Sequence, residues 1–132
     1  MTTAPRRLEL TILPERFAIS QLEANAPIPE WATQGTFFSV TRTRDELSVV
    51  CEESQVPAGS RSQPGWSMLK VHGPFVLTEV GVLSALASPL ADAKLSLCTV
   101  STFDTDYVLV ASRTLSAAIA ALERAGHRIH RS

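Results

Sequence analysis

Two pairs of side chains in this 132-residue chain have the types and spacing of catalytic groups. Asp104 and Asp106 are spaced as in phosphotransferases that use one aspartate to attack phosphorus and the other as an acid or base. That pattern follows the first strand of a large doubly wound sheet, and too little chain follows Asp106 to build one. Ser67 and Lys70 match an S-x-x-K nucleophile pattern, but they fall in an expected strand, where residues three apart face opposite sides. A small hydrolase built on the two aspartates is therefore kept only as a third hypothesis.

Histidine and cysteine supply the other reactive side chains. His127 and His130 are three apart in an expected strand, so their rings diverge, and the sequence offers no third metal ligand. A solvated edge strand explains both histidines better. Cys51 and Cys98 lie inside apolar strands, where a free cysteine usually acts as a small hydrophobic residue. We predict no metal site, no cofactor and no catalytic residue.

Composition narrows the class of protein. Hydrophobic residues make up 45% and charged residues 19% of the chain, which excludes a disordered, collagen-like or coiled-coil protein. Twelve basic and thirteen acidic residues leave a net charge of −1, so we expect neither nucleic acid nor a membrane surface as a partner. No apolar run is long enough to cross a bilayer or to form a signal-peptide core, and two cysteines make no disulfide framework. These features predict a cytoplasmic protein.

The second half of the chain has the more regular patterns. Apolar residues recur at helical spacing over residues 81–90 and again over 115–122, where Gly126 ends the helix. Strands are expected at residues 66–72, 95–100, 107–111 and 127–130. The resulting order, strand-helix-strand-strand-helix-strand, is the ferredoxin-like motif.

The first half repeats part of this plan. It predicts strands at residues 8–13 and 16–22, one helical turn at 30–33, a hairpin of strands 36–42 and 46–52, and a loop at 55–65. The second helix of the motif is absent. We therefore predict an α+β protein with two ferredoxin-like (βαββαβ) units in tandem, antiparallel sheets and helices on one face. Residues 1–63 form the degenerate first unit and residues 64–132 form the second.

Residues 73–110 carry a more specific signal. The matching elements are Gly73-Pro74, Glu79-x-Gly81, Pro89-Leu90-Ala91 and the block from Ser101 to Val110. This stretch resembles the amino-acid-binding ACT domains, in particular those of the CASTOR-type arginine sensors and their small bacterial relatives. Residues 38–50 resemble the N-terminal unit of the same bacterial relatives, and the family's βαββαβ fold agrees with the order of elements above.

The resemblance implies a ligand held between two ACT units, by the loop that enters the first helix of one unit and an early strand of its neighbour. The amides of a helix start suit a carboxylate, glycine allows close approach, and an aspartate suits an ammonium or guanidinium group. The alternative role for Asp106 is to cap the start of a strand. The alternative role for Glu79 is that of a surface carboxylate near the positive end of the helix dipole. The implied ligand-binding residues are Thr78, Glu79, Val80, Gly81, Ser96 on the facing strand, Thr102 as a hydroxyl, Phe103 as a wall, and Asp106.

Two departures from the arginine sensors limit what the resemblance implies. The sensors tend to have a second acidic residue where Thr78 stands, so arginine is not inferred as the ligand. They also hold four ACT units in one chain, whereas this chain holds two, which implies a homodimer. The sequence thus predicts a regulatory module that binds a small molecule, an amino acid, without catalysis and acts on a protein partner in trans. The alternative is a structural protein that keeps the fold for dimerisation or docking and has lost the ligand.

Overall fold

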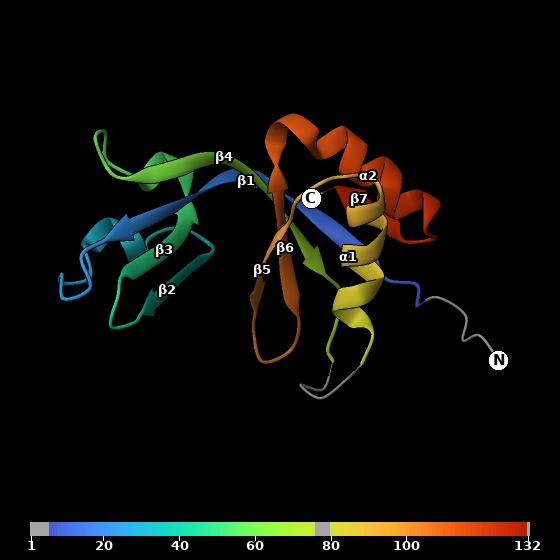
Figure 1. Ribbon diagram of the computed structural model, residues 1–132, viewed down its shortest axis with the longest axis horizontal. Coiled ribbons are helices and arrows are strands. Elements are labelled where there is room, and N and C mark those ends of the chain that lie inside the picture. Colours follow the sequence, from blue (N-terminus) through green and yellow to red (C-terminus); the bar gives the residue numbers. More distant parts are fainter. Residues whose placement is uncertain (1–5, 76–79, 132) are drawn as a thin grey trace. The chain divides into compact units, whose positions relative to one another are not determined.

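A computed structural model describes residues 6–75 and 80–131 (Figure 1). The chain folds as a mixed α+β protein and divides into two compact units. One unit combines Met1–Pro14 with Ser67–Ser132 and is called the split unit here, because two separate pieces of chain build it. The other, Glu15–Trp66, is called the inserted unit. Thr78 and Glu79, two of the predicted ligand contacts, lie outside the described residues.

The elements follow one another in the order labelled in Figure 1. The strands are β1 (Glu9–Leu22), β2 (Phe38–Arg42), β3 (Leu47–Glu52), β4 (Ser62–Val71), β5 (Cys98–Ser101), β6 (Asp106–Ala111) and β7 (Arg128–Arg131). The helices are α1 (Val82–Asp92) and α2 (Leu115–Arg124), with short 3-10 turns η1 (Glu30–Thr33), η2 (Glu53–Gln55) and η3 (Ser112–Thr114).

The sheet of the split unit has the strand order β7-β1-β4-β6-β5. Strands β5 and β6 pair antiparallel, whereas β1 and β7 pair parallel from Glu9 opposite Arg128 to Ile12 opposite Arg131. From β4 to β7 the elements run strand, helix, strand, strand, helix, strand. The first half of β1 lies between β7 and β4. This position was not predicted, since the strand at residues 8–13 was expected in the first of two tandem units.

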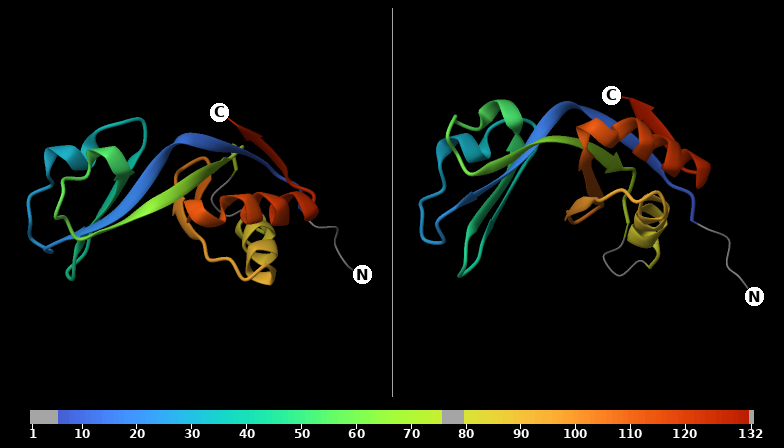
Figure 2. Two further views of the ribbon diagram at one scale, coloured as in Figure 1. Left: turned by 90° about the horizontal axis from the view of Figure 1, so that it is seen from above. Right: turned by 45° about the horizontal axis from the view of Figure 1, so that its top comes forward.

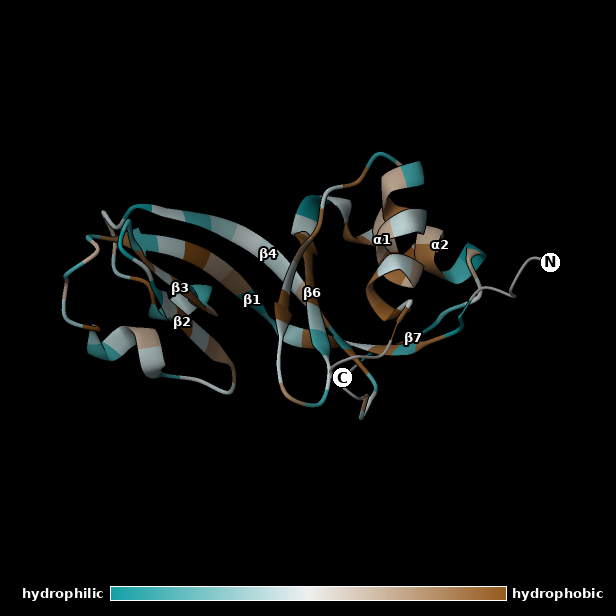
Figure 3. Ribbon diagram, turned by 60° about the horizontal axis from the view of Figure 1, so that its bottom comes forward, coloured by the Kyte–Doolittle hydropathy of each residue, from teal (hydrophilic) through white to brown (hydrophobic). Residues whose placement is uncertain are grey.

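The core of the split unit lies between its sheet and its two helices. Helices α1 and α2 pack side by side, as both views in Figure 2 show. Alternation along β1 and β4 and helical spacing along α1 and α2 direct apolar side chains into one cluster, and Figure 3 shows β6 as hydrophobic along most of its length. The buried members are Leu8, Leu10, Ile12, Leu69, Val71, Val82, Leu86, Leu90, Val108, Val110, Ala118, Ala121 and Leu122.

His127 is a buried structural residue, so the prediction that it lies on a solvated edge strand is wrong. Its Nδ1 accepts a hydrogen bond from the Leu8 amide at 3.0 Å, and its Nε2 donates to the Ala85 carbonyl at 2.7 Å. The Ala85 carbonyl is available because Pro89, four residues on in α1, has no N–H to donate to it. The imidazole thus replaces the missing helical hydrogen bond and lets α1 continue through Pro89 to Asp92.

The inserted unit has the strand order β2-β3-β1-β4. Strands β2 and β3 form the predicted hairpin, whose turn is closed by the Thr43 amide donating to the Glu46 carbonyl at 2.9 Å. One buried cluster joins Ala32 in η1 to Val49 and Cys51 in β3. Strand β4 begins at Ser62, so the loop predicted at residues 55–65 is shorter than expected.

The structure divides the chain differently from the predicted domains at 1–63 and 64–132. The later border, between Trp66 and Ser67, falls three residues from the predicted one, but the first fourteen residues join the C-terminal piece. The physical reason is that Leu8, Leu10 and Ile12 are buried in the same cluster as α1 and α2. Across residues 6–75 and 80–131, no helix combines the length and the apolar character needed to span a membrane.

Candidate functional site

The described part of the predicted loop ends at the start of α1. Val80 is 86% exposed, and Gly81 precedes the helix with a φ of +91°. A Cβ built on Gly81 would meet nothing within 4 Å, so the protein itself requires glycine here for its backbone conformation and not for space. Gly81 has no side chain with which to cap the helix. The first N–H groups of α1 are therefore suited to a bound anion.

Asp106 opens β6, where its carboxylate is already partly engaged. Ser101 Oγ donates to Asp106 Oδ1 at 2.5 Å, and the two residues are opposite one another in the β5–β6 pair. Asp106 Oδ2 has no partner among the described residues. This hydrogen bond fits the alternative role of Asp106, which is to cap the start of a strand. The Oδ2 atom can still accept a hydrogen bond from a cationic group.

The turn between β5 and β6 holds Thr102 and Phe103. The Thr102 hydroxyl and amide both donate to the Thr105 carbonyl, at 3.1 and 2.8 Å. Phe103 is 81% exposed, so most of its ring is open to solvent. The turn therefore offers an apolar ring at its tip and a hydroxyl that is already occupied within the turn.

Two hydrogen bonds fix this turn against the segment that leads toward α1. The Thr105 hydroxyl donates to the Val71 carbonyl at 2.6 Å, and the Phe75 amide donates to the Asp104 carbonyl at 2.7 Å. A Cβ on Gly73 would lie 2.8 Å from the same Asp104 carbonyl, so this glycine is needed for the close approach. The structure thus brings the β5–β6 turn beside the chain that enters the predicted helix loop.

Ser96 does not occupy the place predicted for it. It is exposed and lies two residues before β5 begins, so it is not on a strand that faces the helix start. The apolar character of Leu95 and Leu97 suggested a longer strand, but both side chains instead pack against the core of the split unit.

The reactive side chains considered from the sequence form no catalytic group in the described residues. Ser67 shares a hydrogen bond of 2.8 Å with Ser112, and Lys70 lies exposed farther along the same strand. Burial raises the pKa of the Cys51 thiol, which suits an inert core residue, while Cys98 is exposed, contrary to the prediction. No cluster of three or more histidine, cysteine, aspartate or glutamate side chains able to hold a metal occurs in residues 6–75 and 80–131.

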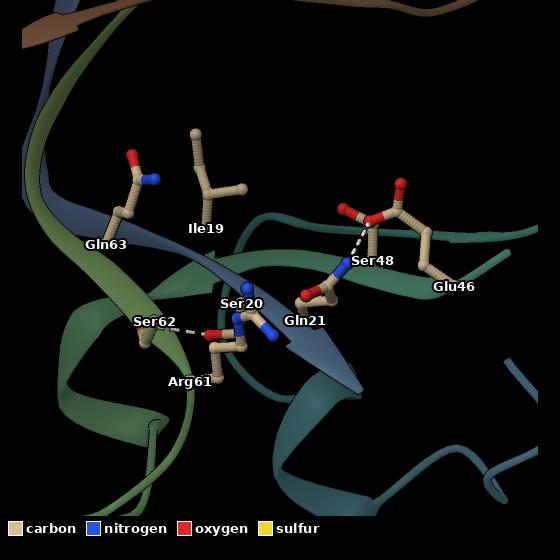
Figure 4. Close-up of a pocket in the computed structure, with 8 residues that line it drawn as sticks. All are labelled: Ile19, Ser20, Gln21, Glu46, Ser48, Arg61, Ser62 and Gln63. Carbon is tan, nitrogen blue, oxygen red and sulfur yellow. Dashed lines mark hydrogen bonds between the residues drawn. The ribbon is translucent and has the colours of Figure 1, made fainter. Parts of the chain in front are cut away.

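The inserted unit contains a polar hollow of about 300 Å³ that was not predicted from the sequence (Figure 4). Three separate stretches of chain, from β1, β3 and β4, supply its walls. No motif signals it, because its residues come together only through strand pairing. The lining residues are Ile19, Ser20, Gln21, Glu46, Ser48, Arg61, Ser62 and Gln63.

The elements from β4 to β7 define a mixed α+β domain with two helices packed on its sheet. Their order along the chain is that of the βαββαβ motif, and β1 adds a further strand between β7 and β4. Residues 61–124 match the family model described as the ACT domain, and residues 15–59 match a second model described as an N-terminal domain. The chain belongs to the ACT domain family.

Curated relatives include the cytosolic arginine sensor for mTORC1 subunit 1 from Homo sapiens and from Pongo abelii. Each is 30% identical over 110 residues, a match that covers 77% of this chain and 33% of the relative. The chain therefore spans about a third of the length of these relatives.

Solved structures of similar fold include a crystal structure of an Agrobacterium tumefaciens protein, with a TM-score of 0.91 and 41% identity over 96% of this chain and 95% of that one. A Vibrio cholerae protein, described as a possible transport protein, has a TM-score of 0.73 and 18% identity, with 89% of each chain covered. Aspartate kinase from Clostridium acetobutylicum has a TM-score of 0.66 and 11% identity, covering 95% of this chain and 36% of that one. The last two show likeness of fold alone.

Proposed function

We propose that this chain is a regulatory module that binds a free amino acid and does no chemistry on it. The observation that carries the proposal is the β5–β6 turn, which presents Asp106 with one unpartnered carboxylate oxygen and is bonded to the segment leading toward the uncapped start of α1. In this arrangement the ligand's ammonium or side-chain cation pairs with Asp106, and its carboxylate accepts from the first amides of α1.

The site extends over the residues named from the resemblance. Val80 and Gly81 form the described part of the helix loop, which Thr78 and Glu79 complete. Phe103 covers the ligand's apolar part, and Ser96 contributes from the segment before β5. Thr102 supplies its hydroxyl by exchanging the hydrogen bond to the Thr105 carbonyl for one to the ligand. Arginine-sensor relatives support the amino-acid class of ligand, and the identity of the side chain is left to the experiment.

The assembly that completes such a site is a homodimer in the cytoplasm. In it the inserted unit acts as a reduced ACT-like unit, with 3-10 turns where a complete unit has helices. The ligand stabilises one arrangement of the units, and a protein partner in trans reads that arrangement. A ligand with no difference in affinity between the arrangements would transmit nothing.

The test is a thermal-shift screen of the full chain against the twenty common amino acids, followed by calorimetry on any that raises the melting temperature. Ligand at about 100 times its dissociation constant adds roughly 2.7 kcal/mol to stability. Asp106→Asn keeps an acceptor for Ser101 but removes the charge, and we expect binding to weaken on the order of tenfold. Asp104→Asn is the matched control, because it changes a carboxylate on the same turn and should leave affinity unchanged. Equal affinity in wild type and Asp106→Asn would remove Asp106 from the site.

The second candidate function is a docking or dimerisation protein without a ligand. Three exposed apolar side chains of the split unit, Val80, Leu83 and Phe103, favour it, because apolar surface that a domain leaves uncovered is available for contact with another protein. In that case no amino acid raises the melting temperature, and Phe103→Ser shifts the oligomeric state measured by light scattering. An unchanged oligomer in Phe103→Ser together with an amino-acid response rejects this second reading.

A further inference from the structure

The hollow in the inserted unit lies on the β3-β1-β4 part of its sheet (Figure 4). Gln21 is opposite Ser48 in the β1–β3 pair, and the Gln21 amide donates to the Arg61 carbonyl at 2.9 Å at the start of β4. Side chains two apart on a strand share a face, so Ile19 and Gln21 project to one side while Ser20 projects to the other. Ser20 is 2% exposed and donates to the Ser62 hydroxyl, a hydrogen bond that ties β1 to β4 on the face opposite the Gln21 side chain.

Opposite charges stand on the two sides of this hollow. Glu46 lies at the β3 side, where its Oε1 accepts from Gln21 Nε2 at 3.2 Å. Arg61 lies at the β4 side, and its guanidinium has neither an ion pair nor a hydrogen bond in the described part of the chain. The two side chains therefore do not neutralise each other, although both line the same space of about 300 Å³.

The separation of the charges follows from the sheet. Strand β1 lies between β3 and β4, and neighbouring strands are about 4.8 Å apart, so the backbones that carry Glu46 and Arg61 are roughly 10 Å apart. Both side chains are long and flexible, so their charged ends can close on an α-amino acid, which takes a charge-assisted hydrogen bond of about 2.8 Å at each end. A single anion or cation would leave one of the two protein charges without a partner.

The other side chains of the lining are mostly polar. Gln21, Ser48 and Gln63 offer amide and hydroxyl groups, and Ile19 is the one apolar side chain of the lining. Such a wall suits a ligand that makes hydrogen bonds along its length. A polyanion such as a nucleotide is disfavoured, because Arg61 is the only cation of the lining and Glu46 would repel it.

We propose that the inserted unit holds a second binding site, which takes a zwitterionic α-amino acid with a polar, uncharged side chain. The ligand's carboxylate binds the Arg61 guanidinium, its ammonium binds Glu46, and its side chain bonds to Gln21, Ser48 or Gln63. This inference rests on residues 19–63 alone and stands independently of the function proposed for the Asp106 region.

The test is an amide nitrogen–proton NMR titration of the full, ¹⁵N-labelled chain with L-glutamine, L-asparagine and L-serine. We expect shifts at the amides of residues 19–21, 46–48 and 61–63. Acetate and methylamine, which carry only one of the two charges, should each perturb one side of the hollow and bind on the order of tenfold more weakly. Absence of shifts at these amides with all three amino acids overturns the proposal.

Charge-removing variants test the assignment of the two ends. Arg61→Gln and Glu46→Gln should each weaken binding of the responding amino acid about tenfold, while Arg44→Gln and Glu23→Gln, exposed residues outside the lining, should not change it. Unchanged affinity in both lining variants overturns the proposal. Shifts confined to residues 80–106 and abolished by Asp106→Asn would also overturn it, while supporting the function proposed above. Shifts in the hollow that persist in Asp106→Asn support this site alone.

Discussion

The split unit and the inserted unit are both built mainly on antiparallel strands, but their cores are made in different ways. In the split unit, α1 and α2 close the sheet and bring Leu86, Leu90 and Leu122 against its strands. The inserted unit, all of whose residues 15–66 are described, has only 3-10 turns beside its strands, and one of its clusters joins just Ala32, Val49 and Cys51. A helix brings a row of large side chains over a sheet, and a single turn does not.

The difference also separates two kinds of candidate site. The split unit offers a helix start and a turn at the edge of a well-filled domain, where backbone amides and one carboxylate carry the recognition. The inserted unit offers the side chains of a sheet face, where Glu46 and Arg61 stand apart across β1. The inserted unit, which has no helix packed on its sheet, thus has more of that sheet available for polar contacts.

The largest expected effect comes from the same truncation made in each core. Leu86 in α1 and Leu47 in β3 are both fully buried, so Leu86→Ala and Leu47→Ala remove identical atoms. We expect Leu86→Ala to lower the free energy of unfolding by about 3–5 kcal/mol, because helices and sheet hold its cavity open, and Leu47→Ala by about 2–3 kcal/mol, because the smaller core relaxes. Urea denaturation followed by circular dichroism measures both. Equal losses of unfolding free energy in the two variants would show that the cores of the two units resist truncation equally.

A smaller effect is expected from two glycines of the inserted unit. Gly35 and Gly59 have φ values of +91° and +86°, so alanine is strained at either position. At Gly35 the added Cβ would also overlap with Oε2 of Glu52, which accepts the Thr36 amide at 2.9 Å, while at Gly59 it would meet nothing within 4 Å. We expect a loss of about 1 kcal/mol for Gly59→Ala and about 2–3 kcal/mol for Gly35→Ala. Thermal unfolding compares them, and a Gly59→Ala loss as large as that of Gly35→Ala would reject the role of Glu52.

The smallest effect concerns the exposed side of the split unit's sheet. A hydrogen bond from His130 at 2.8 Å holds the pKa of Glu9 below its ordinary value of 4.5, and the charges of His130, Arg128 and His72 act in the same direction. A lowered folded-state pKa contributes stability that is present above pH 4.5 and is lost as pH falls through the folded value. We therefore expect the stability of the wild type to fall more steeply below pH 4.5 than that of Glu9→Gln.

The control for this pH effect is His130→Phe, which keeps a ring for the stack of His130 on His72, 5.5 Å apart, and removes the hydrogen bond. Its pH profile should resemble that of Glu9→Gln, and added salt should reduce the difference from wild type. Parallel profiles for wild type and both variants between pH 3 and 6, about the range in which carboxylates titrate, would show that the contact contributes nothing.

Helical spacing and turn chemistry made parts of this fold predictable. The apolar positions from Val82 to Leu90 marked α1, and the polar bend at residues 43–45 marked the β2–β3 hairpin. Both signals are local, since each lies within one element and its turn. The prediction of a strand ending at Pro14 was wrong, because β1 continues through it to Leu22. Pro14 falls between the stretch of β1 that pairs with β7 and the stretch that pairs with β3, where a missing N–H is tolerated.

The features that the sequence did not reveal depend on contacts between distant residues. The bond from His127 to the Ala85 carbonyl joins positions 42 apart and compensates for Pro89, and no spacing rule connects these three residues. The polar hollow likewise depends on the pairing of three strands. For the candidate site around Asp106, the residue types were predicted from a resemblance, while the contacts with Ser101 and Val71 emerged only from the fold.

A discontinuous domain has a practical consequence for dissecting this protein. A recombinant fragment confined to residues 61–124, the stretch that matches the ACT domain, would lack the three apolar side chains of residues 8–12 and the parallel strand at the C-terminal end. Its remaining leucines and valines would face water, and such a fragment should aggregate when expressed alone. A circular permutant that begins at residue 67, runs to residue 131 and continues through a linker into residues 6–14 would reunite the separated pieces without the inserted unit. Because residue 131 lies opposite residue 12 in the parallel pair, that linker has to run back along the sheet for roughly 20 Å to reach residue 6.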